Sequence, residues 1–292
     1  MRGLLTADAY RLRRRPEIWL IAIAIPLFGA LGFINAYYSV PQHYFFDGPT
    51  APPDIVAAIA AEQGTFAFPL SVLRMLDDTI WVAIATFFFV CTSIGAEFPW
   101  GTIRTALLAR SDRAAFLVSR LAWFAAIGAG MVAVLVLVGA IMPTILRALG
   151  ESPTAPISVE TVDLVAVVAS RLVLVGFTIS LGAFLTLITR NAALAFLIAL
   201  VVVLADLIVA GNDALHHSDA LAAVARSMPV TSLIALLDQT STMAQGGEPP
   251  PADPNYIVAT FPLWLSFAVP LAWTLLAGGA AIAIIRRADI SE

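Results

Sequence analysis

Side chains that could carry out chemistry are few in this sequence. The three histidines, His43, His216 and His217, lie outside the long apolar runs, and there is no His-Glu-x-x-His motif of an intramembrane zinc protease. His216 and His217 stand near Asp213 and Asp219, which could bind a cation weakly, but exposed loop residues are the simpler interpretation. We therefore predict no catalytic residue and no metal site.

The basic side chains are all arginine. Lys and Arg together number sixteen, and every one of them is Arg. A P-loop needs a lysine to hold nucleotide phosphates, and a Schiff base needs a lysine amine, so both are excluded. The single cysteine, Cys91, lies in an apolar run and is expected to act as a small packing residue.

Two charged residues, Arg171 and Asp206, lie inside apolar runs. Arg171 precedes the predicted turn near Arg190 by nineteen residues and Asp206 follows it by sixteen, so a helical hairpin would place them at similar heights. An unpaired charge inside a bilayer costs about 3 kcal/mol or more. Three interpretations stay open: an ion pair between them, separate contacts with the outer interface, and a pathway for substrate or protons.

Residues 95–113 form a polar stretch between two apolar runs. Pro99 and Gly101 predict a turn, and Thr102 is a suitable N-cap for a short helix after it. Leu107 and Leu108 would then offer apolar contacts. The charges that keep the stretch in water are Glu97, Arg104, Arg110, Asp112 and Arg113. A short polar helix fixed between two spans suits docking better than catalysis, with an ordinary basic loop as the alternative.

Composition indicates a membrane protein. Of 292 residues 60% are hydrophobic and only 12% are charged. Six mostly apolar runs of about twenty residues or more match a hydrocarbon core about 30 Å thick. The predicted spans are residues 18–37, 79–96, 116–142, 164–188, 192–210 and 263–285. The predicted fold class is an all-α polytopic membrane protein, with residues 1–292 forming a single transmembrane domain.

The segments outside the spans also show apolar patterns. Residues 1–15 predict an amphipathic helix lying on the membrane surface, although a basic tail that only sets topology is an alternative. The segments 38–78 and 211–262 are predicted to be external. Short helices lying at or dipping into the outer interface are expected in them, at residues 55–61, 70–76 and 230–237.

Arginine is distributed unequally between the two sides of the predicted spans. Only Arg74, Arg147 and Arg226 fall on the side of the long loops, and that side as a whole carries thirteen acidic residues. The positive-inside rule therefore places both termini in the cytoplasm. The opposite side has twelve arginines: Arg2, Arg11, Arg13, Arg14, Arg15, Arg104, Arg110, Arg113, Arg120, Arg190, Arg286 and Arg287.

Residues 95–120 resemble the permease subunits of bacterial ABC transporters of the type-2 export family. The resemblance rests on Gly-Ala-Glu-Phe-Pro-Trp-Gly-Thr-Ile-Arg-Thr at 95–105, then Leu107-Leu108, Ser111-x-Arg113 and Arg120, between spans two and three. The basic surface helix, the six spans and the long external segment between spans five and six are similar in architecture.

The resemblance implies a short cytoplasmic coupling helix between spans two and three that docks on a separate ATPase. The implied coupling residues are Glu97, Gly101, Thr102, Arg104, Leu107, Leu108, Arg110 and Arg113. It also implies two ATPase subunits that bind ATP and Mg, a second permease copy, identical or not, and surrounding membrane lipids, with no cofactor and no nucleic acid bound by this chain.

On this reading the chain is not itself an enzyme. It would be the membrane-spanning subunit of an exporter for a drug-like, lipid or other amphiphilic substrate. Two alternatives remain open at this stage. One is a polytopic membrane enzyme acting on lipids, which needs clustered polar groups at one depth, and the other is a sensor or scaffold for an external ligand.

Overall fold

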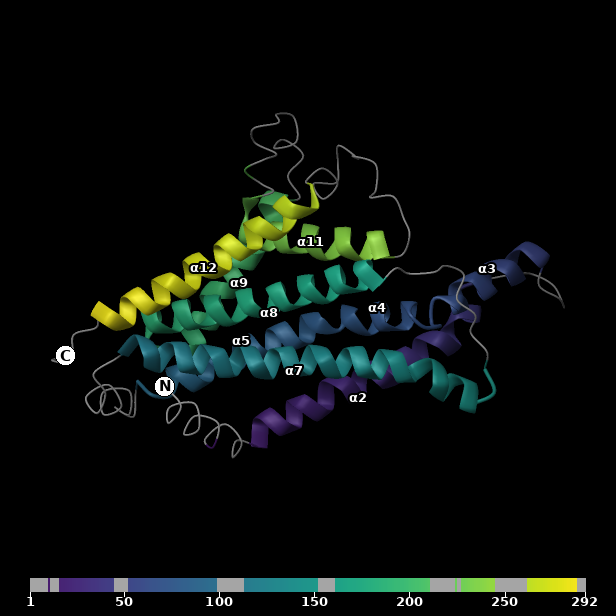
Figure 1. The fold of residues 1–292 in the computed structure, drawn as a ribbon, viewed down its shortest axis with the longest axis horizontal. Coiled ribbons are helices and arrows are strands. Elements are labelled where there is room, and N and C mark those ends of the chain that lie inside the picture. Colours follow the sequence, from purple (N-terminus) through teal and green to yellow (C-terminus); the bar gives the residue numbers. More distant parts are fainter. Residues whose placement is uncertain are drawn as a thin grey trace.

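The chain forms an elongated bundle of long helices that lie side by side (Figure 1). The structure is a computed structural model that describes residues 10, 16–44, 52–98, 113–151, 161–210, 224, 227–244 and 262–287. Within these ranges the chain has no strand. Its elements are α2 (Pro16–Ser39), η1 (Val40–His43), α3 (Pro53–Gly64), α4 (Leu70–Asp77), α5 (Thr79–Gly95), α7 (Arg113–Ala148), α8 (Thr161–Thr189), α9 (Ala192–Ala210), α11 (Pro229–Ala244) and α12 (Leu263–Arg287).

Five stretches in the described part are long and apolar enough to cross a membrane. They are Ile18–Ser39, Leu70–Gly95, Arg113–Ala148, Leu164–Thr189 and Leu263–Arg287. These helices confirm the prediction of a helical membrane protein. The sixth predicted span stays a prediction, because α9 offers only the shorter apolar stretch Ala192–Asp206.

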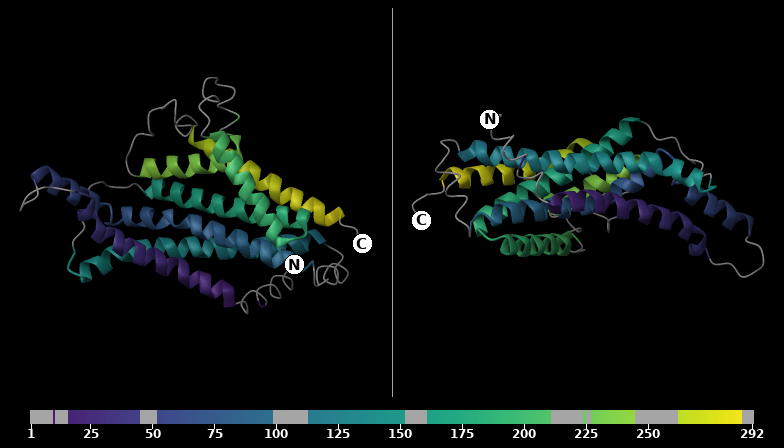
Figure 2. Two further views of the ribbon diagram at one scale, coloured as in Figure 1. Left: turned by 180° about the vertical axis from the view of Figure 1, so that it is seen from behind. Right: turned by 90° about the horizontal axis from the view of Figure 1, so that it is seen from below.

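Helix α8 lies at the centre of the bundle. It packs against α5, α7, α9, α11 and α12 (Figures 1 and 2). Successive long helices run in opposite directions, so the end of α5, the start of α7 and the ends of α8 and α12 share one end of the bundle. Most described arginines lie at or near that end, and most described carboxylates lie toward the other.

Helix α4 differs most from expectation. Residues 70–76 were predicted to lie at the outer interface, but α4 packs inside the bundle against α7. After a single turn residue, Asp78, the chain continues into α5, so the two helices form one stretch, Leu70–Gly95. The acidic pair Asp77-Asp78 interrupts the apolar run, and for this reason the sequence places the start of the span at residue 79 and not at residue 70. Six of the eight residues of α4 are buried: Leu70, Ser71, Val72, Leu73, Met75 and Leu76.

The turn between α8 and α9 has the form expected from the sequence. Arg190 adopts a positive φ of 53°, which ends α8 in a left-handed turn. The side-chain oxygen of Asn191 then accepts hydrogen bonds from the backbone N–H groups of Ala193 and Leu194, at 2.9 and 3.3 Å. Asn191 thus caps α9, and the prediction of a hairpin turning near Arg190 is confirmed.

Tyr37, in the last turn of α2, is buried. Its hydroxyl donates a hydrogen bond to Glu151 Oε2 at 2.9 Å, and its ring meets Phe66 edge-on at 5.4 Å. This contact ties the end of α2 to the segment after α7. Trp19, Trp81 and Trp264 are exposed on the bundle surface, as expected of side chains that face lipid or the membrane interface.

Gly139 allows α7 to approach α4 closely. A Cβ at this position would lie 2.7 Å from Val72 Cα and 3.0 Å from Ser71 O, which are both backbone atoms. Backbone cannot move aside as a side chain can. A glycine is therefore required where the two helices cross.

We expect Gly139→Ala to separate α7 from α4 and to lower the free energy of unfolding by about 1–3 kcal/mol. Gly130 is the matched control, because it lies on the same helix and a Cβ there would meet nothing within 4 Å. Gly130→Ala should be neutral, or stabilising by up to about 1 kcal/mol. Unfolding of both variants in one detergent gives the comparison, and equal stabilities would contradict the close packing.

Candidate functional site

The predicted coupling segment is described only at its two ends. Glu97 lies in the turn that follows α5, and Arg113 is the first residue of α7, where it is half-buried. The other predicted coupling residues lie outside the described residues: Gly101, Thr102, Arg104, Leu107, Leu108 and Arg110. Residues 1–9 and 11–15 of the predicted surface helix lie outside them as well.

An ion pair joins the helices on either side of this segment. The Glu97 carboxylate accepts a hydrogen bond from Arg120 Nη2, and the two side chains are only 13% and 8% exposed. The Arg120 guanidinium also lies 4.7 Å from the centre of the Phe116 ring. We call Glu97, Arg120 and Phe116 the clamp.

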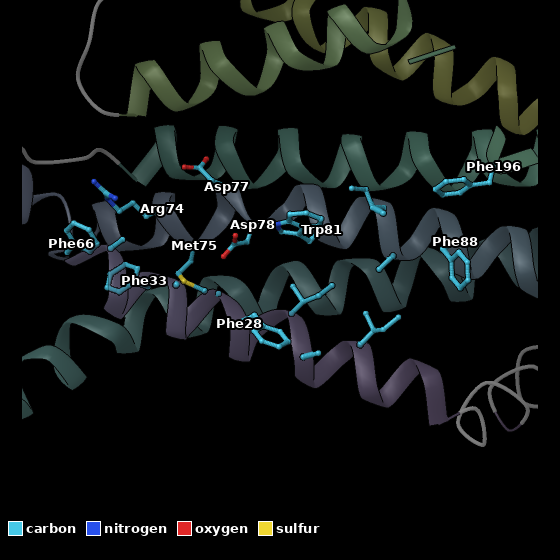
Figure 3. A pocket seen from close by; sticks show the side chains of 18 residues that line it. Phe28, Phe33, Phe66, Arg74, Met75, Asp77, Asp78, Trp81, Phe88 and Phe196 are labelled. Carbon is cyan, nitrogen blue, oxygen red and sulfur yellow. The ribbon is translucent and has the colours of Figure 1, made fainter. Parts of the chain in front are cut away.

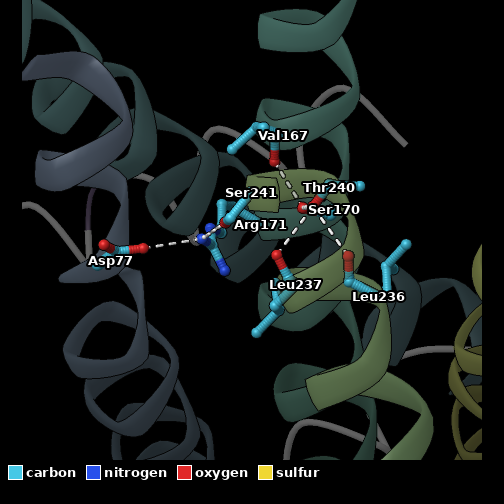
Figure 4. A network of polar contacts seen from close by, with 8 residues as sticks. All are labelled: Asp77, Val167, Ser170, Arg171, Leu236, Leu237, Thr240 and Ser241. Carbon is cyan, nitrogen blue, oxygen red and sulfur yellow. Dashed lines mark hydrogen bonds and ion pairs between the residues drawn. The ribbon is translucent and has the colours of Figure 1, made fainter. Parts of the chain in front are cut away.

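Arg171 is the centre of a polar network inside the bundle (Figure 4). Its Nη2 donates hydrogen bonds to Asp77 Oδ1 at 3.0 Å and to Ser241 Oγ at 2.9 Å. The guanidinium therefore connects α8 with α4 and α11. The Arg171 side chain is 6% exposed, whereas that of Asp77 is 70% exposed, so the pair is buried on one side and open on the other.

A second contact in the network joins α8 to α11 one residue away from Arg171. The hydroxyls of Ser170 and Thr240 lie 3.0 Å apart, and both residues are fully buried (Figure 4). Each hydroxyl also bonds a carbonyl of its own helix, Ser170 to Val167 and Thr240 to Leu236. Because the Ser170 and Thr240 hydroxyls bond each other and their own helices, this contact serves the packing of α8 against α11.

Asp206 has different partners from Arg171. Its carboxylate accepts hydrogen bonds from the backbone N–H groups of Val230, at 2.6 Å, and Thr231, at 3.3 Å, and from the Thr231 hydroxyl. These groups form the first turn of α11, where the N–H groups have no helical partner and a negative charge is favoured. Of the three interpretations of Arg171 and Asp206, the mutual ion pair is therefore not the arrangement in the structure, because α11 supplies Asp206 with donors and Arg171 pairs with Asp77.

A cavity of about 790 Å³ lies between α2, α4 and α5, with Phe196 of α9 at one end (Figure 3). We call it the groove. Its walls are mainly apolar and aromatic, and several of them, including Phe28, Trp81 and Phe88, are more than half exposed, so the groove opens at the side of the bundle. Its charged residues are Arg74, Asp77 and Asp78.

The two neighbouring carboxylates of the groove point away from each other. Figure 3 shows Asp77 turned toward α8, where it meets Arg171, and Asp78 turned toward α2. A Cβ on Gly29 would lie 2.6 Å from Asp78 Oδ2, so the carboxylate fits against α2 only because residue 29 is glycine. Asp78 is half-buried, and its side chain has no hydrogen bond or ion pair with any described residue.

Arg74, the positively charged residue of the groove wall, makes its contacts at the outer end of the groove. Its Nε donates to Thr65 Oγ1 at 3.0 Å, and its guanidinium lies 3.9 Å above the Phe66 ring. Nearby, the Tyr44 hydroxyl donates to Glu62 Oε2 at 3.0 Å, and this hydrogen bond raises the pKa of Tyr44 above its usual value. Arg74 is thus held toward α3 and the segment before α4.

The described residues contain no group of three or more His, Cys, Asp or Glu side chains that could hold a metal ion. Comparison with known proteins gave no lead: no family model, no curated protein and no solved structure matches the chain. The geometry of the clamp, the network and the groove therefore carries the functional argument alone.

The groove carboxylate was missed from the sequence. Asp77 and Asp78 were assigned to an external loop because they precede the apolar run. The signal was present, since an acidic pair is flanked by apolar residues on both sides in Leu70–Gly95. An acidic pair within one long apolar stretch marks a position where charge is either paired or functional.

We expect Asp77→Asn and Arg171→Gln to be non-additive. Each change breaks the same contact, so the double variant should be more stable than the sum of the two single losses by about 1 kcal/mol. Unfolding free energies in a single detergent supply the cycle. As a control, Arg171→Gln combined with Asp206→Asn should be additive, since these residues share no partner in the described structure. If the Arg171–Asp206 cycle were non-additive and the Asp77–Arg171 cycle additive, the ion pair would instead join Arg171 and Asp206.

Proposed function

We propose that this chain is the membrane-spanning permease subunit of an ATP-driven exporter of the ABC type. A separate cytoplasmic ATPase supplies the energy, and the chain works beside a second permease copy in a bacterial cytoplasmic membrane. The substrate is drug-like, lipid or otherwise amphiphilic. In this proposal α9 is the sixth span and both termini are cytoplasmic.

The separation of charge between the two ends of the bundle supports this orientation. Arg113, Arg190, Arg286 and Arg287 lie at the end that carries the segment between α5 and α7. By the positive-inside rule that end faces the cytoplasm, where an ATPase would be found. The absence of lysine from the whole sequence, and with it of a P-loop, means that the energy must come from another chain.

The clamp is the observation that carries the proposal. A segment that passes force from an ATPase to two helices must be fixed at both ends, because a loose loop would absorb the movement. The Glu97–Arg120 ion pair fixes the end of α5 to the start of α7, directly beside the segment. An ordinary surface loop has no need of a buried charge pair, which is costly to desolvate.

The docking role is tested by Leu107→Asp. A docking helix would bury the new carboxylate against the ATPase without a partner, so the variant should lose the ATPase. The chain is expressed with the ABC ATPases of its own genome, and co-purification is measured. Leu149→Asp is the matched control, because Leu149 is an exposed leucine just after the opposite end of α7, and it should keep the ATPase. Retention of the ATPase by the Leu107 variant would reject docking at this segment.

The clamp is tested by exchanging its charges. Glu97→Gln or Arg120→Gln breaks the buried ion pair, at a cost of about 3 kcal/mol, and should abolish stimulation of ATP hydrolysis by substrate while the ATPase stays bound. The exchanged pair, Glu97→Arg with Arg120→Glu, should restore most of the stimulation. Full stimulation in either single variant would show that the ion pair has no part in coupling.

A further inference from the structure

We propose that the groove binds a cationic amphiphile, whose apolar body lies between α2 and α5 and whose positive charge lies against the Asp78 carboxylate. The inference deepens the proposed function, because it names the class of the exported substrate. It depends on a binding site that can be measured in this chain without any ATPase.

The size and lining of the groove fit an amphiphile. A volume of about 790 Å³ lies within the range of ligand pockets, which is roughly 300–1,000 Å³. Along α2 the wall runs from Ile21 to Ala36, which is about 22 Å of helix at 1.5 Å per residue. The charged residues of the groove, Arg74, Asp77 and Asp78, lie beside the middle and outer part of this wall, since Asp78 meets α2 at Gly29, and the lining from there toward Phe88 and Phe196 is apolar. A ligand whose charge lies at Asp78 would therefore place its apolar part along this stretch.

The sign of the ligand's charge follows from the charges of the groove. Asp77 is neutralised by Arg171 at 3.0 Å, and the Arg74 guanidinium, which keeps its charge, is turned away from Asp78 toward Thr65 and Phe66 at the outer end. The Asp78 carboxylate is left without an ion pair or hydrogen bond in the described structure, although it is half-buried among apolar side chains. A carboxylate in such surroundings is stabilised by a cation and destabilises an anion.

The aromatic residues around Asp78 favour the same class of ligand. Trp81 lies one turn along α5 from Asp78, and Phe28 faces both from α2 (Figure 3). The faces of aromatic rings attract cations, and quaternary ammonium groups are recognised in this way. A cation whose charge is shielded by carbon, and which is therefore poorly hydrated, gains most from this combination of a carboxylate and ring faces.

Gly29 and Gly32 keep the groove open on the α2 side. A Cβ on Gly29 would collide with the Asp78 carboxylate, whereas a Cβ on Gly32 would meet nothing within 4 Å. A large side chain at position 32 would therefore enter the empty groove without straining the helix contacts. This difference supplies a variant that fills the site and leaves the carboxylate in place.

The test uses the full chain in nanodiscs of neutral phosphatidylcholine, without ATPase. The probes are tetraphenylphosphonium and tetraphenylborate, which have nearly the same shape and opposite charge. Binding is measured by equilibrium dialysis, with empty nanodiscs as the background. Saturable binding of the phosphonium above background and none of the borate is expected. Equal binding of the two ions, or no saturable binding of the phosphonium, would overturn the proposal.

Two variants and one control localise the site. Asp78→Asn should weaken phosphonium binding about tenfold, the loss expected for one charge-assisted contact. Gly32→Leu should weaken it similarly by filling the groove. Asp54→Asn removes the same charge from the exposed start of α3, outside the groove, and should bind as the wild type does. Equal affinities in Asp78→Asn and wild type, or equal losses in Asp54→Asn, would overturn the site.

The remaining occupant to test is a second copy of the chain. If the groove were covered by a partner helix, Gly32→Leu would change the oligomeric state measured by light scattering, and that result would also overturn the proposal. An unchanged state with weakened binding supports it. If the chain docks on the ATPase but does not bind the phosphonium, the ligand proposal alone is rejected. If it binds the phosphonium but does not dock on the ATPase, only the proposed coupling is rejected.

Discussion

The arrangement of the short helices in the bundle depends on the contacts of Arg171. The guanidinium is buried in the central helix α8, where an unpaired charge would cost several kcal/mol, and its contacts with Asp77 and Ser241 bring α4 and α11 to the same point. These contacts add to the buried apolar side chains by which each short helix packs in the bundle. Asp206 strengthens the same arrangement from α9, since its carboxylate receives the first N–H groups of α11. Arg171 and Asp206, two charges inside apolar runs, thus help to position the short helix α11.

The long helices could be predicted from the sequence, because an apolar run of about twenty residues leaves the backbone few alternatives in a membrane. The hairpin turn near Arg190 followed from the break between two such runs, whereas the Asn191 cap is seen only in the structure. Partner choice did not follow. Arg171 and Asp77 are 94 positions apart, and Gly139 meets α4 through a crossing that no local pattern encodes. Arg171 and Asp206 lie at similar heights along the hairpin, but the direction in which each side chain leaves its helix decides which charges meet.

The junction of α4 and α5 explains how one acidic pair has two roles. Asp77 is the last residue of α4 and Asp78 is the turn residue before α5, so successive side chains leave the backbone in different directions. One carboxylate is used for the bundle, through Arg171. The other faces α2, where Gly29 removes the side chain that would displace it. A continuous helix with an apolar residue at either position would have either the ion pair or the charged groove, but not both.

Helix α5 links the two regions on which the proposed function rests. Asp78 and the open part of the groove lie at its start, and Glu97 of the clamp follows its end, about 25 Å away for seventeen residues. A movement imposed on the segment after α5 would therefore be carried along a single rigid helix toward the carboxylate of the groove. The Asp77–Arg171 contact opposes this movement, because it holds the same junction to α8. Asp77 is exposed and Arg171 is buried, so Asp77 can move away from Arg171 without exposing the core. Force from an ATPase would then act first where the ligand's charge is held.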